Sequence, residues 1–331
     1  MRRLFQHSSM FLFLILFLIY APALRANGSE VLVSVSDAQS VMGCSESAMS
    51  GADYLTPVPK KVTETKGCYS FVGEPEVRIQ VRQRDFSSPE AYVLEVSPKG
   101  VFIKAGGDAG AFYAQQTLAQ LIAFSASGKA GVLQTTTIQC VRIEDEPRFG
   151  YRGLHVDVSR HFRSVDFLKK QMDAMALFKM NKMHLHLTDA AGWRIQIDAY
   201  PRLTEFAAWR PEALWKDWWA GQRLYTQENS EGAYGGYYTK QDIAELVRYA
   251  AERHIELIPE IEMPSHSEEV LAAYPALGCS GEAYKDSDFC VGKEEVFTFL
   301  ETVLDEVIEM FPSQFIHIGG DEAGKQHWKT C

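Results

Sequence analysis

The chain has 331 residues, of which 46% are hydrophobic and 12% aromatic, enough apolar material for a sizeable core and two domains. Its net charge of -10 and its lack of a basic stripe argue against a nucleic-acid-binding protein. Six tryptophans and 14 tyrosines suit stacking on sugar rings, but they suit an ordinary large core equally well.

Residues 1–26 are typical of a secretory signal peptide. The basic pair Arg2-Arg3 precedes the apolar stretch 10–20, and small residues within 21–26 provide two candidate cleavage sites. Because the stretch is short for a bilayer-spanning helix, we expect export to the periplasm or the outside of the cell. No membrane span should then remain after cleavage. An uncleaved anchor is the alternative.

Export would permit disulfides among the six cysteines. Cys279 and Cys290 bracket a polar segment and could close it into a loop. A pair of Cys44 with Cys68 is conceivable. The spacings fix no connectivity and match no zinc-binding pattern.

The N-terminal region, residues 27–147, shows alternating apolar and polar residues that predict strands at 77–81, 92–96, 101–104 and 135–142. A helical pattern covers residues 108–125, with apolar side chains on one face. We expect residues 27–147 to form a small α+β domain without clustered catalytic residues.

From residue 148 onward the pattern changes to strands that alternate with helices. Strands are predicted at 153–158, 182–188, 255–261 and 314–319, and helices at 164–180, 239–254 and 293–310. Such alternation indicates a parallel sheet with helical crossovers. Long insertions, residues 189–238 and 262–290, follow the second and third strands, where a β/α barrel keeps its active site.

Four strands are half of the eight that a closed (β/α)8 TIM barrel needs. We therefore predict an α/β fold in which residues 148–331 form a partial TIM barrel, truncated after its fourth strand. A doubly wound sheet is the competing fold. No glycine-rich phosphate loop follows the first strand, which argues against a nucleotide-binding version of it.

Polar side chains gather at the ends of the four predicted strands. They are Asp157, Arg160 and His161 at the first, His184, His186 and Asp189 at the second, Glu260, Glu262 and His266 at the third, and Asp321 and Glu322 at the fourth. Because these ends meet at one edge of a parallel sheet, they are the usual place for a site.

Some of these residues have structural alternatives. Asp157 could cap a strand end. His184 and His186 alternate with apolar residues and could be hydrogen-bonded core histidines. Their His-x-His spacing also occurs in metal sites, although the carboxylates nearby favour a site without metal or cofactor.

The pair Asp321-Glu322 is the most informative feature. It follows the apolar-rich run 315–318 and the glycines Gly319 and Gly320, which allow the chain to leave the strand direction. Two carboxyls close together raise one of their pKa values, as suits a general acid. The alternative, a solvated acidic turn, fits poorly after such an apolar run.

A retaining glycosidase normally places two carboxyls about 5 Å apart, one of them the nucleophile. Adjacent residues seldom provide that arrangement. We therefore expect Glu322 to protonate the leaving oxygen and Asp321 to orient a nucleophile that belongs to the substrate, such as a 2-acetamido group.

At these residues the chain resembles glycoside hydrolase family 20, the β-N-acetylhexosaminidases, from about residue 50 to the end. The matching segments are residues 152–162, 182–189, 192–195, 200–204, 259–266 and 317–322. The resemblance implies removal of terminal β-linked GlcNAc or GalNAc from glycans, with retention and without metal or cofactor.

The resemblance also implies roles for five residues. Glu322 is the general acid/base, and Asp321 holds the acetamido nitrogen of the substrate. Arg160 binds hydroxyls of the terminal sugar, and Asp189 with His266 forms a charge chain that tunes Glu322.

Two departures from the family pattern matter. Ala190 stands where many members have a second Asp, and the later strands that wall the sugar are missing. We therefore expect a truncated chain that is inactive as given. Alternatives are a non-catalytic glycan-binding protein that keeps the motif and a metal-dependent hydrolase that uses the histidines. The sequence predicts no oligomeric state.

Overall fold

The computed structural model describes residues 51–126, 135–329 and 331. The chain forms two compact units: the first ends at Gly150 and includes Leu177–Lys179, and the second comprises Tyr151–Ala176 and Met180–Cys331. The expected signal peptide and Cys44 lie outside the described residues. Among those described, none of the helices has the length and apolar character needed to cross a membrane.

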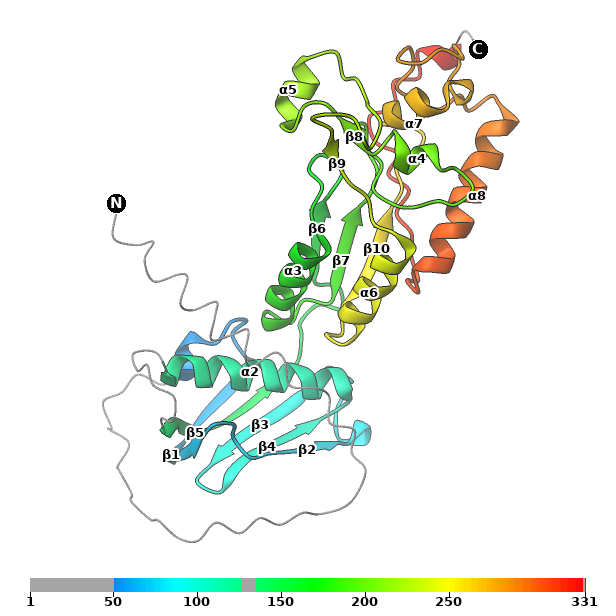
Figure 1. The fold of residues 1–331 in the computed structure, drawn as a ribbon. Coiled ribbons are helices and arrows are strands. Elements are labelled where there is room, and N and C mark those ends of the chain that lie inside the picture. The colour runs from blue at the N-terminus through cyan, green and yellow to red at the C-terminus, as the bar shows by residue number, and fades with distance from the viewer. Residues whose placement is uncertain (1–50, 127–134, 330) are drawn as a thin grey trace. The chain divides into compact units, whose positions relative to one another are not determined.

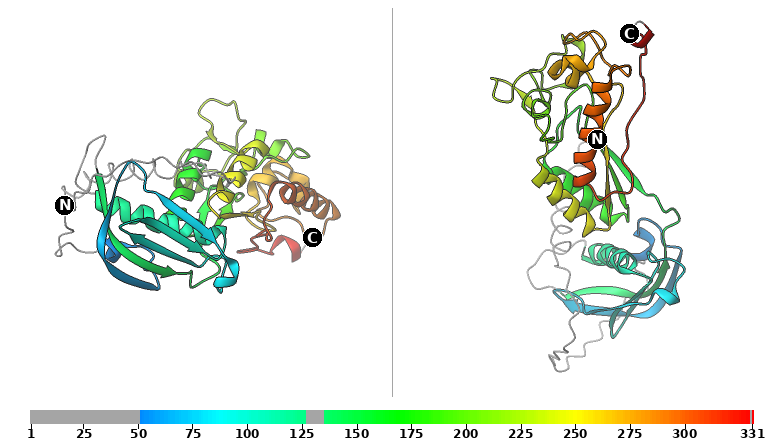
Figure 2. Two further views of the ribbon diagram at one scale, coloured as in Figure 1. Left: turned by 90° about the horizontal axis from the view of Figure 1, so that it is seen from below. Right: turned by 90° about the vertical axis from the view of Figure 1, so that its right-hand side faces the viewer.

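The first unit is a five-stranded sheet with one long helix on one face (Figures 1 and 2). In spatial order its strands are β1 (Lys61–Val72), β5 (Thr135–Asp145), β3 (Tyr92–Ser97), β4 (Gly100–Ala105) and β2 (Val77–Val81). The helix α2 (Asp108–Ala126) packs Tyr113, Leu118 and Leu121 into the core of this unit. Short 3-10 turns, η1 (Gly51–Tyr54) and η2 (Gln83–Asp85), complete it.

β1 is the strand that the sequence pattern did not predict. Among the described strands it pairs with β5 alone, and it is exposed along most of its length, so its residues lack a clear apolar alternation. The register with β5 also shifts between Glu64 and Cys68. An irregular edge strand of this kind leaves a weak signal in the sequence.

The second unit is built on three parallel strands, β6 (Gly153–Asp157), β7 (Lys182–His186) and β10 (Glu256–Glu260), with β7 in the centre. The helices α3 (Val165–Leu177) and α6 (Lys240–Ala251) connect them, and α8 (Glu294–Met310) follows β10. This is the α/β alternation that the sequence predicted.

Both crossover helices begin with a side-chain cap at the first residue of the predicted range. Ser164 Oγ accepts a hydrogen bond from Phe167 N at 3.3 Å. Thr239 forms a capping box with Asp242, in which each side chain accepts from the other residue's backbone N–H. These caps fix where each helix starts after its preceding loop, and so fix the loops at the strand ends.

The predicted fourth strand, residues 314–319, is shorter than expected. Only His317 bridges to Glu260, although hydrogen bonds from His317 N to Pro259 O and from Ile261 N to His317 O keep the segment parallel to β10. Within the described residues nothing pairs with its outer edge, and Phe315 and Ile318 stay exposed. An unpaired edge explains why the segment is not a full strand.

The long insertions gather beyond the carboxyl ends of the parallel strands (Figure 1). The first carries the elements α4 (Arg202–Glu205), β8 (Trp209–Arg210), α5 (Trp215–Ala220) and β9 (Tyr234–Gly235). The second carries α7 (Glu268–Ala273) and η3 (Pro275–Leu277), and η4 (His327–Lys329) lies near the end of the chain.

Two buried arginines hold the first insertion together. Arg194 donates to the carbonyls of Ser159, Ala191, Ala208 and Gly236, and Arg210 donates to those of Arg160, Ala191, Glu212 and Ala213. Buried carbonyls need such partners because no water reaches them. The two side chains thereby fix the backbone around Arg160, which the sequence pattern gave no reason to expect.

Candidate active site

β6 and β7 place a basic and two acidic side chains against one another. β6 ends at Asp157, and Arg160 Nη1 lies 3.1 Å from Asp157 Oδ2. Arg160 Nη2 lies 2.7 Å from Oδ2 of Asp189, on the loop after β7. The guanidinium is therefore held by two carboxylates, while about a third of the Arg160 side chain remains exposed.

Asp189 is the buried centre of this arrangement, with 4% of its side chain exposed. Its Oδ2 lies 3.1 Å from His186 Nε2 and 3.5 Å from His266 Nδ1, in addition to the contact with Arg160. A buried carboxylate is costly unless it is paired. Three basic partners meet that requirement, and they converge on one oxygen.

His266 connects Asp189 to the acidic pair. It lies on the loop after β10, and its Nε2 is 3.1 Å from Glu322 Oε2. Its contact with Glu262, aided by the other nearby carboxylates, outweighs burial and raises the pKa of His266 to about 9. The imidazole is therefore protonated at neutral pH and donates toward Glu322.

Asp321 and Glu322 lie on the turn that leaves the segment beside β10. Gly319 and Gly320 have φ angles of +62° and +97°, in the left-handed region that favours glycine. Glu322 has a φ of +55°, which is uncommon for other residues and recurs at functional sites. The Asp321 and Glu322 side chains are 66% and 79% exposed, so two adjacent carboxyls face outward.

Glu262 is a buried carboxyl that packs against this turn. Its Oε1 accepts a hydrogen bond from Gly320 N at 3.2 Å, and a Cβ at position 319 would lie 2.0 Å from its Oε2. Burial and the hydrogen bond to Asp321 raise the pKa of Glu262, and the same bond lowers the pKa of Asp321. The like-charge interaction was expected within the pair Asp321-Glu322, whereas the structure places it between Asp321 and the buried Glu262.

A second buried carboxylate, Glu260, lies among four histidines. Its Oε2 is 2.6 Å from His186 Nδ1, 2.8 Å from His184 Nε2 and 3.6 Å from His155 Nε2, and its Oε1 is 2.9 Å from His317 Nδ1. Although burial opposes it, contact with His184 and His186 holds the pKa of Glu260 well below its usual range. The alternative of a core histidine therefore suits His184, whereas His186 also reaches Asp189.

Some of these donors are spaced as metal ligands are. The ligand atoms of His155, His184 and Glu260 lie within 4.8 Å of one another. Both histidines lie within ion-pair distance of the glutamate, although His184 Nε2 forms no hydrogen bond of good geometry with it.

His161 does not join the group, although it follows β6 as the other site residues do. Its Nδ1 lies 3.5 Å from Tyr234 Oη, and burial together with the charge of Arg210 lowers the pKa of His161. Sequence position alone could not separate His161 from its neighbour Arg160, because both follow the strand end directly.

Of the other residues that converge here, the sequence placed His186, Glu260 and Glu262 at strand ends but assigned none of them to the site. A useful signal was present in the strand itself. Side chains two residues apart on a strand share a face, so His184 and His186 lie on one face, and the register of the structure places His186 beside Asp157 and Glu260 on that face.

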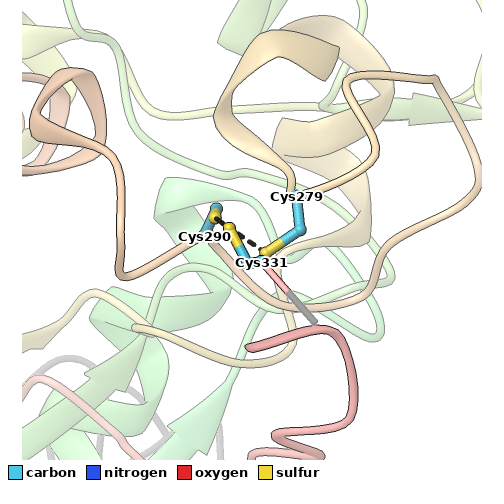
Figure 3. A group of neighbouring side chains, drawn as sticks. All are labelled: Cys279, Cys290 and Cys331. Carbon is cyan, nitrogen blue, oxygen red and sulfur yellow. Dashed lines mark hydrogen bonds between the residues drawn. The ribbon is translucent and has the colours of Figure 1, made fainter. Parts of the chain in front are cut away.

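Three cysteines lie together beside this region (Figure 3). The Sγ atoms of Cys279 and Cys290 are 2.7 Å apart, so the structure brings the expected pair together without a bond between them, and Cys331 Sγ lies 3.0 Å from Cys290 Sγ. All three are free thiols in this structure. The suggested pair of Cys44 and Cys68 involves a residue outside the described part of the chain.

These contacts define what the arrangement can do chemically. Glu322 is an exposed carboxyl beside a protonated imidazole, and the buried Asp189 balances that imidazole from its other side. Such a chain stabilises the ionised form that an acid takes after it has given up its proton. Asp321 adds a second, ionised carboxylate beside it.

Comparison with protein families identifies both units. The model for the catalytic domain of glycosyl hydrolase family 20 matches residues 149–331, and the model for domain 2 of the same family matches residues 38–146. The two matches together account for most of the chain.

Among curated proteins, the chain is 43% identical to a beta-hexosaminidase of Porphyromonas gingivalis over 251 residues, covering 73% of this chain and 30% of that protein. It is 37% identical to a beta-hexosaminidase of Akkermansia muciniphila over 290 residues, covering 81% and 55%. The chain therefore spans between about a third and about half of these relatives.

Solved structures give the same result. A beta-N-acetylhexosaminidase matches with a TM-score of 0.71 and 33% identity, over 86% of this chain and 57% of that one. An exo beta-N-acetylglucosaminidase from Vibrio harveyi, in complex with N-acetylglucosamine, matches with a TM-score of 0.70 and 29% identity, over 88% and 50%. The described chain thus has an α/β fold similar to that of these hexosaminidases, and it belongs to glycosyl hydrolase family 20.

Proposed function

We propose that the chain is the N-terminal part of an exo-acting β-N-acetylhexosaminidase that removes terminal β-linked GlcNAc or GalNAc from glycans with retention. The observation that carries this proposal is the line of contacts Asp189–His266–Glu322, which ends beside Asp321. Family membership and the names of the relatives support the same activity.

In the first step Glu322 acts as the acid. Its carboxyl proton moves to the glycosidic oxygen as the bond between that oxygen and C1 breaks, and the leaving alcohol departs neutral. The carbonyl oxygen of the substrate's 2-acetamido group bonds to C1 from the opposite face. The resulting oxazolinium-like intermediate carries its positive charge near the acetamide nitrogen.

Asp321 is the carboxylate that stabilises this positive charge. The lowered pKa of Asp321, caused mainly by its hydrogen bond with Glu262, keeps it ionised at working pH. An ionised carboxylate accepts the acetamide N–H and stabilises the positive charge as it forms. It also orients the acetamide so that its oxygen faces C1.

In the second step Glu322 becomes the base. Water attacks C1, its proton passes to the Glu322 carboxylate, and the bond between C1 and the acetamide oxygen breaks. Two inversions at C1 give net retention. Glu322 must therefore be a good acid and then a good base, and the protonated His266 at 3.1 Å stabilises its ionised form between the steps.

Arg160 is placed to bind the sugar. Asp157 and Asp189 hold its guanidinium in one orientation, and its exposed remainder can donate to sugar hydroxyls. Because these two carboxylates hold the guanidinium before substrate binds, the Arg160 side chain loses little conformational entropy on binding.

We also propose that the catalytic unit is a partial TIM barrel and is inactive by itself. The relatives extend well beyond the matched region, and the segment after β10 forms only one bridge to the sheet. A closed barrel requires eight strands, and an open edge is a liability. The basic and apolar N-terminal residues support export, as expected above.

The proposal is tested by assaying the full-length protein on two aryl glycosides. It should release 4-nitrophenol from the β-linked GlcNAc glycoside but hardly from the β-linked glucoside, which lacks the acetamido nucleophile. Equal rates on both would refute the substrate-assisted mechanism. Release from the first glycoside by residues 27–331 alone would refute the proposal of an inactive part.

A further inference from the structure

We propose that His186 is a positioning residue that couples the sugar-binding Arg160 to the Asp189–His266–Glu322 line, with Glu260 as its buried anchor. This inference rests on the function proposed above, because it assigns His186 a part in the same reaction.

The geometry around the His186 ring supports the coupling. Nδ1 lies 2.6 Å from Glu260 Oε2, an ion-pair contact on the side of the sheet. Nε2 faces two groups at once, Asp189 Oδ2 at 3.1 Å and Arg160 Nη1 at 3.0 Å. His186 therefore connects the buried Glu260 both to Arg160 and to the Asp189–His266–Glu322 line.

Those two contacts of Nε2 make opposite demands. A protonated Nε2 can donate to Asp189, whereas an unprotonated Nε2 can only accept, and the donor beside it is Arg160. One nitrogen cannot do both at the same time. The protonation state of His186 therefore decides whether it supports the charge of Asp189 or the orientation of Arg160.

The groups that face His186 favour its charged form. Carboxylates face it from β6, from the loop after β7, and from β10 and the residues that follow. The titratable and charged groups around it are Asp157, Asp189, Glu260, Glu262, His155, His184 and Arg160. Burial disfavours the charged imidazole, but contact with Asp189 and Glu260 outweighs it and raises the pKa of His186 to about 10.

A consequence for Glu322 follows from the charge balance. The His186 imidazolium neutralises part of the Asp189 charge, which would otherwise act on His266 alone. Without it, the site carries one more net negative charge, so both His266 and Glu322 hold their protons to higher pH. Arg160 also becomes less well oriented, because Asp189, which holds its Nη2 at 2.7 Å, loses the partner that fixes its carboxylate.

The test uses the full-length protein and the variant His186→Gln, which keeps an amide donor near Asp189 but has no titratable ring. We expect the basic limb of the pH profile of kcat/KM to move up by about half a pH unit or more. We also expect KM for the β-linked GlcNAc aryl glycoside to rise about threefold or more, because Arg160 is less well oriented.

His184→Asn is the matched control. Its ring also contacts Glu260, at 2.8 Å, but among the described contacts it reaches neither Asp189 nor Arg160. This variant should keep the parent's pH profile and KM, even if it unfolds more easily. An equal shift in His184→Asn would show that any change in the core moves the profile, and would overturn the inference.

His186→Asn provides a second variant in case His186→Gln does not fold. It also removes the titratable ring beside Asp189, so the basic limb should move in the same direction. If either variant folded and kept the parent's pH profile of kcat/KM and the parent's KM, the inference would be overturned. No activity in the parent protein would instead refute the proposed function, so the two failures are distinguishable.

Discussion

Replacing Gly319 by alanine perturbs the turn that presents the acidic pair. The φ of +62° at this position costs a residue with a side chain about 1 kcal/mol. The added Cβ would also lie 2.0 Å from Glu262 Oε2, well inside van der Waals contact. Either the buried carboxyl or the turn must therefore move.

Movement of Glu262 has a further cost. Its hydrogen bond from Gly320 N, at 3.2 Å, would be broken or weakened, leaving a buried polar group without its partner. Such a loss costs about 1 to 3 kcal/mol. Together the two effects predict a loss of about 2 to 4 kcal/mol in the free energy of unfolding of the catalytic unit.

Gly232→Ala is the matched control, since Gly232 has a φ of +76° but no atom within 4 Å of an added Cβ. It should lose only the backbone part, about 1 kcal/mol. Urea unfolding of both variants in the full-length protein measures the difference. If Gly319→Ala were no less stable than Gly232→Ala, the inferred contact with Glu262 would be wrong.

Three further outcomes are expected. The pKa of His266 is raised from 6.5 to about 9. The charged imidazole therefore makes its whole contribution to the free energy of unfolding below pH 6.5, and this contribution disappears above about pH 9. His266→Gln should therefore lower the unfolding free energy more at about pH 6 than at about pH 10, and the reverse order would contradict the ion-pair interpretation. A chelator should leave the activity of the full-length protein unchanged; activity lost to it and restored by zinc would favour the metal-dependent alternative. Peptide mapping of oxidised protein should find one disulfide that contains Cys290, joined to Cys279 or Cys331, with the third thiol free for alkylation, whereas a Cys279–Cys331 bond would contradict the observed cluster.

Sequence periodicity was sufficient for the regular elements. α6 and α8 have strongly amphipathic patterns, and α6 begins at a threonine cap, so their positions could be predicted. β1 could not be, because an exposed edge strand with a register shift shows little alternation. The segment 314–319 was predicted as a strand from its apolar residues, but a strand also needs partners on its edges, which periodicity does not reveal.

Some residues of the site could likewise be predicted from the sequence, and others could not. Asp189, His266 and Glu322 could be assigned because they follow strand ends in segments that resemble family 20. The roles of Glu262 and His186 depend on distances across the fold, such as that between Glu262 and the turn at Gly319, and no local pattern encodes these distances. Arg194 and Arg210 were missed for the same reason, since their partners are backbone carbonyls far apart in the sequence.

The central claim is that Glu322 is the acid that protonates the leaving group. It is tested most directly by measuring how much kcat/KM falls in Glu322→Gln, in the full-length protein, on substrates with a poor and with a good leaving group. An acid matters most when the leaving group is poor. The variant should therefore lose at least about a hundredfold in kcat/KM on the GlcNAc β-1,4-linked disaccharide. On a dinitrophenyl β-GlcNAc glycoside, whose leaving group needs no proton, the loss should be much smaller. Glu282→Gln, at an exposed loop position, should behave as the parent on both substrates. Equal losses of Glu322→Gln on both substrates, or no loss on either, would contradict the claim.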